Sequence, residues 1–450
     1  MKGKLNMSTM KAITRTVLTR FFCITAMLAA LMSVQAEVCL SSDYSTVGGS
    51  TTWSTAHTNN FNMVISGTLN NSSSLTNDYL NILTVNSTGA LKNNSGGTLN
   101  IAAVTWLDHY GILTNASGAT LNNAGQTFLY PNSTLSNAGT VNNDSYMELQ
   151  SGGALTNSSI LNNTSALDNT GALTNALAAT LNNTGSGSVT VWNGGTFTNA
   201  GVVQNDAMMF NAGGNVINSG TINSTLTLVT YGTLTNTGAI TNSGYFSNSA
   251  TMTNSGAGTY TQSAGHTIND ATITTATPLA INGGILSGYG TVIGAVTIAA
   301  GADVMPGDSS VGTLTLGALT SSGNYHFELG GVATPLFDQL IVNGAATFAA
   351  GTVTFDFVND FSAKKGDHWD FLAADSLSGF NNLTFGVTGL DSGYWKIDTN
   401  GGVATLSITG PDVPVTTPEP STYLLMLISF ACLAAVKGKM GKKSLLAASP

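Results

Sequence analysis

The chain has 450 residues, of which only 8% are charged, and it is rich in Gly, Asn, Ser and Thr. Between Glu37 and Thr417, four lysines stand against 21 acidic residues, and their difference is a formal charge of −17. Such a body cannot neutralise phosphates, so nucleic acid is not an expected partner. Cys39 is the one cysteine in this part of the chain, which excludes a disulfide framework and a cysteine-based metal site.

The first 36 residues have the pattern of a secretory signal peptide. An apolar core runs from Phe21 to Met32 and is followed by Ser33-Val-Gln-Ala36, a small-residue cleavage site. The segment before the core is positively charged through Lys2, Lys4, Lys11, Arg15 and Arg20. We therefore expect residues 1–36 to be removed after Ala36 and the protein to be exported, with the Sec translocon as a partner. Residues 37–66 are expected to form an N-terminal cap.

Residues 67–285 contain an internal repeat of roughly 20 residues. A first unit, Leu-x-Asn or a close variant, recurs at spacings of 22, 22, 20, 18, 24, 19 and 18, beginning at Leu91, Leu113, Leu135, Leu155, Leu173, Phe197, Val216 and Leu234. A second unit of the type Leu-Asn-Asn follows most copies, as at Leu121, Val141, Leu161 and Leu181. A third, more apolar segment often closes the repeat, as in Thr127-Phe-Leu-Tyr130.

Three short strands per repeat predict an all-β fold, a parallel β-helix in which each repeat is one coil. Alternation places aliphatic residues inside and Thr and Ser outside. We expect Asn and Gly to adopt left-handed backbone geometry at the corners, and stacked Asn side chains to form amide ladders. Ten or so coils at about 4.8 Å each predict a rod of roughly 50 Å. The alternative, a disordered Asn/Ser-rich segment, conflicts with the regular apolar positions.

Residues 286–410 read as a β-rich capping region. Met305-Pro-Gly307 forms a turn before the strand Gly312-Thr-Leu-Thr-Leu316, and Phe337-Asp-Gln-Leu340 and Gly366-Asp-His-Trp369 follow. This order resembles the closing portion of autotransporter-type β-helix passengers, and the resemblance implies a fold without an activity. No segment resembles the membrane barrel that ends a true autotransporter.

Motifs for catalysis are weak. Gly288-Tyr-Gly290 lacks the spacing and the following helix of a nucleotide-binding loop. Ser362-Ala-Lys-Lys365 lacks the partner motifs of acylating enzymes. The histidines are far apart and are expected to be surface residues: His57, His109, His266, His326 and His368. A hydrolase would need two carboxylates, for which Asp108, Asp144, Glu148 and Asp168 are the candidates. We expect no catalytic site, no cofactor and no metal.

The tail, residues 411–450, combines a short motif with an anchor. Pro418-Glu419-Pro420 precedes an apolar stretch at 421–436, and the basic residues Lys437, Lys439, Lys442 and Lys443 follow. The order resembles the PEP-CTERM sorting signal of Gram-negative bacteria. The resemblance implies a transmembrane helix in the inner membrane, processing by an exosortase, and release to the cell surface or an exopolysaccharide matrix. An ordinary C-terminal anchor is the alternative.

Together these features predict an exported, non-enzymatic surface or matrix protein, a structural or adhesive solenoid with exopolysaccharide as a partner. The second hypothesis is a carbohydrate-active enzyme, a lyase or hydrolase, on the same fold. The third is an ice- or surface-binding protein.

Overall fold

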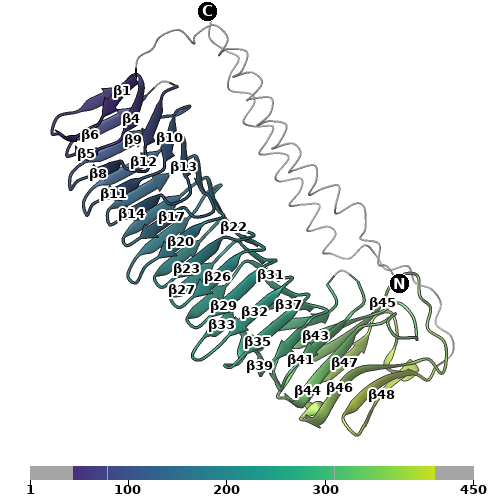
Figure 1. Cartoon of the computed structure of the whole chain (residues 1–450). Coiled ribbons are helices and arrows are strands. Elements are labelled where there is room, and N and C mark those ends of the chain that lie inside the picture. The colour runs from purple at the N-terminus through teal and green to yellow at the C-terminus, as the bar shows by residue number, and fades with distance from the viewer. Residues whose placement is uncertain (1–43, 79, 309, 411–450) are drawn as a thin grey trace, which may run out of the picture.

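The computed structural model describes residues 44–78, 80–308 and 310–410, which form a rod of stacked β-coils (Figure 1). Fourteen successive coils contain three strands each, and a wider β-region closes the far end. The first strands of the coils, with those of the closing region, form the 17-stranded sheet A: β1 (Tyr44–Val47), β4 (Asn62–Ile65), β7 (Ile82–Val85), β10 (Trp106–His109), β13 (Gln126–Leu129), β16 (Tyr146–Leu149), β19 (Ala166–Asn169), β22 (Ser188–Trp192), β25 (Met208–Ala212), β28 (Thr227–Thr230), β31 (Tyr245–Asn248), β34 (His266–Asn269), β37 (Gly284–Gly288), β40 (Ala302–Pro306), β43 (Asn324–Leu329), β45 (Thr352–Phe357) and β47 (Thr384–Val387).

The other two strands of each coil belong to the 32-stranded sheet B. Its middle row is β2 (Ser50–Trp53), β5 (Thr68–Asn71), β8 (Ala90–Asn93), β11 (Ile112–Asn115), β14 (Thr134–Asn137), β17 (Ala154–Asn157), β20 (Ala172–Asn175), β23 (Thr196–Asn199), β26 (Asn215–Asn218), β29 (Thr233–Asn236), β32 (Thr251–Asn254), β35 (Thr272–Thr275), β38 (Thr291–Ile293) and β41 (Thr313–Leu316). Its third row is β3 (His57–Asn59), β6 (Ser74–Asn77), β9 (Thr98–Ile101), β12 (Thr120–Asn123), β15 (Thr140–Asn143), β18 (Ile160–Asn163), β21 (Thr180–Asn183), β24 (Val202–Asn205), β27 (Thr221–Ser224), β30 (Ala239–Asn242), β33 (Thr259–Gln262), β36 (Leu279–Ile281), β39 (Val296–Ile298) and β42 (Leu319–Ser321).

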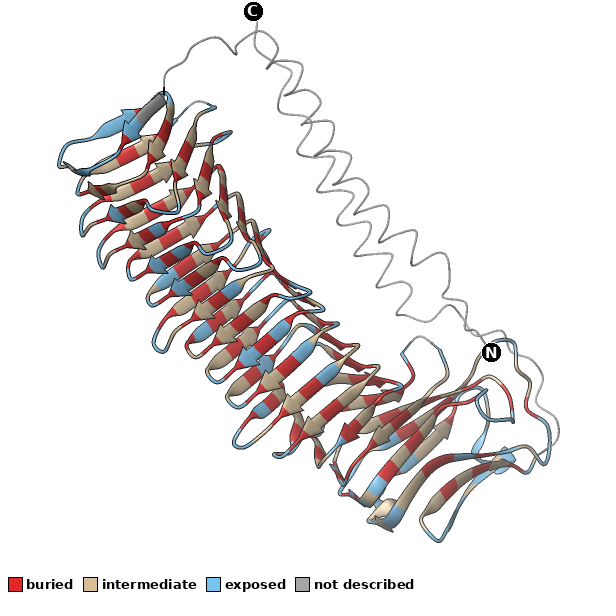
Figure 2. Ribbon diagram, viewed as in Figure 1, coloured by how far each residue is buried: buried red, intermediate tan, exposed pale blue. Residues whose placement is uncertain are grey.

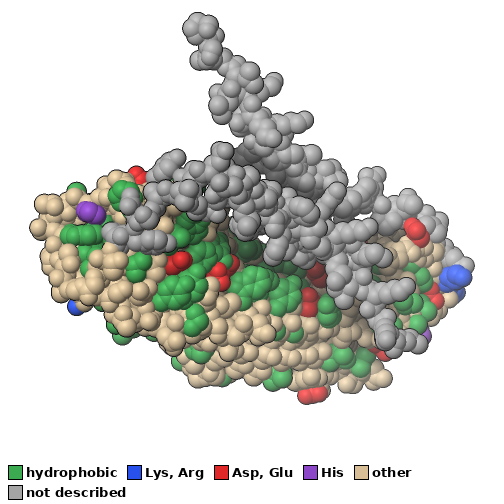
Figure 3. Space-filling view, turned by 45° about the horizontal axis from the view of Figure 1, so that its top comes forward, with side chains coloured by type: hydrophobic (Ala, Val, Ile, Leu, Met, Phe, Trp, Pro, Cys, Tyr) green, Lys and Arg blue, Asp and Glu red, His purple; other side chains and the backbone are tan. Residues whose placement is uncertain are grey.

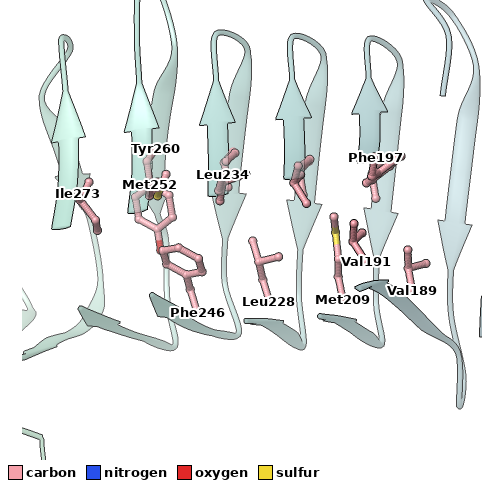
Figure 4. Close-up of a cluster of buried hydrophobic side chains, with 14 of the residues drawn as sticks. Val189, Val191, Phe197, Met209, Leu228, Leu234, Phe246, Met252, Tyr260 and Ile273 are labelled. Carbon is pink, nitrogen blue, oxygen red and sulfur yellow. The ribbon is translucent and has the colours of Figure 1, made fainter. Parts of the chain in front are cut away.

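Each coil strand pairs in parallel with the strand three places later, so equivalent residues stack directly. Leu113, for example, lies between Leu91 and Leu135. Most strands have four residues, of which the second and fourth are buried and the first and third face outward. The second position is usually Leu, Val, Ile, Met or Phe, and the stacked copies form one continuous core (Figures 2 and 4). The predicted parallel solenoid is confirmed.

The fourth position explains the repeated asparagines. The middle row carries ten buried asparagines, and the Nδ2 of each of the first nine donates to the Oδ1 of the next one at 2.7–2.9 Å: Asn71, Asn93, Asn115, Asn137, Asn157, Asn175, Asn199, Asn218, Asn236 and Asn254. The same amide also holds the next coil's corner, as where Asn93 Nδ2 donates to the carbonyl of Thr120 at 2.8 Å. The expected amide ladder is confirmed.

The expected left-handed corner geometry is confirmed for glycines such as Gly96 and Gly118 and for Asn132, but it is wrong for the ladder asparagines. The described residues other than Gly with positive φ are Leu80, Val104, Asn132, Ala178, Asn359 and Asp360. The ladder asparagines are therefore not left-handed corner residues. They end a strand with the side chain turned inward, because the amide satisfies backbone carbonyls that the corner removes from the sheet.

A second inner ladder runs along the third row from Asn123 to Asn205 in the same direction and passes on to Ser224. An outer ladder on the same strands runs the opposite way, since Asn182 Nδ2 donates to Asn162 in the preceding coil and the pattern continues to Asn100.

Ladder polarity accounts for buried amide atoms without a partner. Asn254 Nδ2 has none at the end of the middle row, where Thr275 occupies the next place and its hydroxyl bonds to the carbonyl of Thr277. In sheet A, the Oδ1 atoms of Asn211 and Asn248 have none, and both are at the beginning of a short run. At the beginning of a ladder the first Oδ1 has no donor before it, and at the end the last Nδ2 has no acceptor after it.

The far end of the rod closes where strand direction changes. β44 (Gln339–Phe348) pairs in parallel with β41 and β42, and β46 (His368–Ser378) pairs in parallel with β44. The last two strands, β48 (Trp395–Asn400) and β49 (Val403–Ile408), are antiparallel, with β49 beside β46. Two short 3-10 turns lie on either side of β47 in the chain: η1 (Phe380–Asn382) follows β46, and η2 (Ser392–Tyr394) precedes β48.

A buried carboxylate joins the motifs that the sequence placed in the closing region. Asp338 accepts the N–H groups of Gly312 and Glu328, each at 2.7 Å. Burial raises the pKa of Asp338 to about 7, and the two N–H groups oppose that rise. The role of this residue is therefore to hold the closing region together.

Some of the regions assigned from the sequence have other boundaries in the structure, and others lie outside the described residues. Residues 44–66, within the expected N-terminal cap, already contain coil strands, and three-strand coils continue to Ser321, past residue 286. Across the described ranges, no helix has the length and apolar character needed to cross a membrane. The signal segment 1–36 and the tail 411–450, including the transmembrane segment expected at 421–436, lie outside the described residues.

Candidate ligand-binding face

The two sheets present different side chains to solvent. Over β5 to β35, the outward positions of sheet B carry mainly Thr, Asn, Ala and Ser, and none of these described positions is aromatic. The outward side of sheet A, with the residue that follows each strand, carries an aromatic row that we call the aromatic face: Trp106, Tyr110, Phe128, Tyr130, Tyr146, Trp192, Phe210, Tyr231, Tyr245 and Tyr289. Figure 3 shows hydrophobic side chains interspersed with acidic ones along one flank of the rod.

The aromatic rings are densest over β10, β13 and β16. Tyr110 and Tyr130 stack with ring centroids 4.1 Å apart and planes 8° from parallel. Phe128 lies between Tyr130 and Tyr146, with centroids 6.2 and 5.8 Å away. Trp106 is the first residue of β10, and it donates its indole N–H to Gln126 Oε1 at 3.2 Å. In-register stacking of coils produces this arrangement, because it places residues about 20 apart in sequence side by side.

Three carboxylates are interspersed with these rings. Glu148 and Asp168 are directly paired on adjacent coils, and the Tyr146 hydroxyl lies 3.1 Å from Glu148 Oε2 and 3.2 Å from Asp168 Oδ2. Tyr130 donates to Asp108 at 3.4 Å. Burial raises the pKa of Asp108 and of Asp168, and hydrogen bonds to those carboxylates only partly oppose it. Burial and the two neighbouring carboxylates raise the pKa of Tyr146, so its hydroxyl stays protonated.

A second group of rings lies further along the same face. Phe210 and Tyr231 are edge to face at 5.6 Å, and Tyr245 and His266 at 6.1 Å. His266 Nε2 is 2.7 Å from Ser287 Oγ, and burial lowers the pKa of this histidine against the opposing effect of Asp308. Burial is also the main reason why the pKa of Asp270 is raised.

The carboxylates that the sequence offered for a hydrolase are partly brought together. Asp108, Glu148 and Asp168 lie on the aromatic face. Asp144 is exposed at a corner, where it accepts a hydrogen bond from Thr164 at 2.8 Å. The aromatic row was not predicted from the sequence. Its signal was the third, apolar segment of the repeat, in which Phe and Tyr recur at the coil spacing.

The histidine expectation was wrong for His109. Its side chain is fully buried at the inward fourth position of β10, with Nε2 2.8 Å from the carbonyl of Thr134. Burial lowers its pKa to about 4, so the ring is neutral near pH 7. Asp108 and His109 do point to opposite sides, as expected for strand neighbours.

The other motifs remain without a site. Ser362 and Lys365 lie in a segment with no helix, and β38, not a helix, follows Gly290. Within the described ranges, no three His, Cys, Asp or Glu side chains gather as metal ligands. The sorting motif Pro418, Glu419 and Pro420, the lysines at 437–443 and the cleavage residue Ala36 lie outside the described ranges.

Fold and face together define a long parallel β-solenoid with one aromatic, acidic flank. No family model matches the chain, and no curated protein matches it. Among solved structures, the chain is similar to a fragment of TibA hyper-glycosylated by TibC, at 14% identity, over 76% of this chain and 93% of that one, with a TM-score of 0.23. A likeness this distant carries no functional argument.

Proposed function

We propose that the protein is an exported, non-catalytic rod that binds polysaccharide along the aromatic face, at the cell surface or in an exopolysaccharide matrix. One observation carries this proposal. Exposed and half-buried aromatic rings follow the outward side of sheet A, whereas the outward positions of sheet B from β5 to β35 have none. A solenoid needs no such asymmetry for its core, since the core residues point inward on every strand.

The chemistry of the face suits sugars. The C–H faces of pyranose rings stack on aromatic side chains, and carboxylates accept hydrogen bonds from sugar hydroxyls. Rings repeated from coil to coil offer a row of subsites about 4.8 Å apart, so a polymer gains affinity through several weak contacts. The amide ladders hold the coils rigidly, which reduces the entropy lost on binding.

Export and sorting are part of the proposal and rest on residues outside the described ranges. A signal peptide at 1–36, the motif at 418–420 and the anchor at 421–436 would route the protein through the Sec translocon and an exosortase-type enzyme. Replacing Pro418, Glu419 and Pro420 by alanine tests this route. Membrane-retained protein with an uncleaved tail supports it, and unchanged release refutes it.

The binding test uses the purified full-length protein and a panel of polysaccharides in affinity electrophoresis. We expect retardation by at least one polysaccharide, and loss of most of it in Tyr110→Ala/Tyr130→Ala. The matched control is Thr156→Ala/Thr174→Ala, on the outward side of sheet B. Equal retardation of both variants would overturn the proposed face, and no retardation by any polysaccharide would overturn the function.

The carbohydrate-active enzyme has one specific observation in its favour, the pairing of Glu148 with Asp168. Incubation with the same polysaccharides, with and without calcium, decides the matter. If the wild-type protein releases cleavage products and Glu148→Gln does not, the protein is a hydrolase and the non-catalytic binding proposal is wrong.

Surface or ice binding is favoured by a different flank. The outward third position of the middle row carries Thr114, Ser136, Thr156, Thr174 and Thr198 in consecutive coils, and Thr235, Thr253 and Thr274 further on. In this regular column, the hydroxyls of successive coils are about 4.8 Å apart. Thermal hysteresis of the purified protein tests this candidate, and its absence removes ice as the ligand.

A further inference from the structure

The aromatic face also constrains the charge of its ligand. Asp108, Glu148 and Asp168 lie among the rings of the first group, and Asp270 and Asp308 lie near those of the second. No described strand of sheet A contains a lysine or arginine. Lys92 is the one described cation before Lys364, and it points outward from sheet B. Within the described residues, no lysine or arginine therefore balances the negative charge of this flank.

The carboxylates lie partly out of water. Asp108, Glu148 and Asp168 are half-buried, and the aromatic neighbours displace solvent from them. A half-buried carboxylate without a cation loses hydration, and hydrogen bonds from neighbouring side chains return only part of it: from Tyr130 to Asp108, and from Trp192, Tyr146 and Thr190 to Asp168. A ligand that brings a positive charge would restore the lost stabilisation.

Ring faces and carboxylates together match one chemical group. A primary ammonium is attracted to the face of an aromatic ring within about 6 Å of its centroid, and it donates three hydrogen bonds that carboxylates accept. Phe128 and the Tyr110–Tyr130 stack supply rings beside Asp108, and Tyr146 supplies a ring beside Glu148 and Asp168. The same face repels a polymer of uronic acids, because like charges would meet across a partly desolvated surface.

Building on the proposed polysaccharide-binding function, we propose that the preferred ligand is a polysaccharide with free primary amino groups. Its ammonium groups lie against the rings of Tyr130 and Tyr146 and pair with Asp108 and with Glu148 and Asp168. The sugar rings between them stack along the aromatic face. A neutral glycan makes the stacking contacts alone and binds more weakly.

The test compares two oligosaccharides that differ only in acetylation, chitosan hexamer and chitin hexamer, by titration calorimetry with the full-length protein. The pH is chosen so that the amines are protonated and the carboxylates ionised. We expect the free-amine form to bind about tenfold more tightly, and added salt to reduce this advantage. Polygalacturonate serves as the anionic comparison and is expected not to compete.

Variants separate charge from stacking. Glu148→Gln/Asp168→Asn is expected to lower the affinity for chitosan hexamer toward that for chitin hexamer while leaving the latter unchanged. Asp206→Asn is the matched control, because Asp206 is exposed at a corner and accepts a hydrogen bond from Thr225 at 2.7 Å. Circular dichroism of each variant verifies that the solenoid is folded.

The outcomes distinguish the two proposals. If chitin hexamer or polygalacturonate binds as tightly as chitosan hexamer, the preference for amino groups is wrong and polysaccharide binding stands. If the control variant loses as much affinity as the double variant, the attraction is general to the acidic body and the assigned site is wrong. If nothing in the wider panel binds, both proposals fail together.

Discussion

The middle-row ladder runs from Asn71 to Asn254. Removing one asparagine from its centre should destabilise the rod more than removing its last asparagine. In Asn157→Ala, Asn137 Nδ2 loses its acceptor at 2.7 Å, and Asn175 Oδ1 loses its donor at 2.8 Å. The bond to the carbonyl of Thr180, at 3.0 Å, is lost as well. The three asparagine side chains are buried, so water does not replace their lost partners, whereas Thr180 is half-buried.

The magnitude follows from these groups. An average hydrogen bond contributes about 1 kcal/mol, and a buried polar atom left unpaired costs about 1–3 kcal/mol. Asn137 Nδ2 keeps the carbonyl of Ile160, so Asn175 Oδ1 carries most of the penalty. We expect Asn157→Ala to lower the free energy of unfolding by about 3–5 kcal/mol.

Asn254→Ala is the matched control at the ladder's end. Asn254 Nδ2 already lacks a partner, and its Oδ1 accepts from Asn236 at 2.9 Å. Asn236 Nδ2 keeps the carbonyl of Thr259, so the expected cost is about 1–2 kcal/mol.

Urea unfolding followed by circular dichroism measures both variants, and amide hydrogen exchange in β17, β20 and β23 locates the loss, since a repeat protein can open in segments. An equal cost at the two positions would refute the role of ladder continuity.

The remaining predictions concern pH. Asn157→Asp places a carboxylate where a donor is required, which raises its folded pKa above the unfolded value near 3.9. The variant should therefore lose stability as pH rises through that range, and a pH-independent loss would contradict this. Burial lowers the pKa of His109 to about 4, so wild-type stability should fall as pH drops from about 6.5 toward 4, by roughly 3 kcal/mol. Melting temperatures of His109→Gln should lack that slope. Because the pKa of Asp338 is raised to about 7, its contribution has the opposite sign, and stability should fall as pH rises from about 4 to 7. Asp338→Asn should flatten that part of the profile, and an unchanged profile would show that Asp338 ionises normally.

Much of the fold could be read from the sequence because the code is local and repeated. Leu at the second place and Asn at the fourth recur in strand after strand, and identical neighbours stack when coils align. The amide ladder was therefore predictable. The conformation of the same asparagines was not, because Asn serves equally in a left-handed corner and as an inward side chain, and only the coil's path selects between them.

The candidate site depended far more on the tertiary structure. Corner lengths vary, with two residues between β14 and β15 but four between β11 and β12, so sequence spacing alone does not say which outward residues share a column. Tyr110 and Tyr130 become a stacked pair, and Glu148 and Asp168 become neighbours, only once the register is fixed. The inward position of His109 likewise follows from its place as the fourth residue of β10.

The repeated residue pattern is enough to specify a parallel solenoid with an amide-lined core, because each coil carries the same inward residues and burial requires the coils to stack. The tertiary structure alone decided which flank bears the aromatic rings and carboxylates, where each ladder ends and which atoms remain unpaired there. Those properties depend on register between coils, and register is set by the whole stack and not by any single repeat.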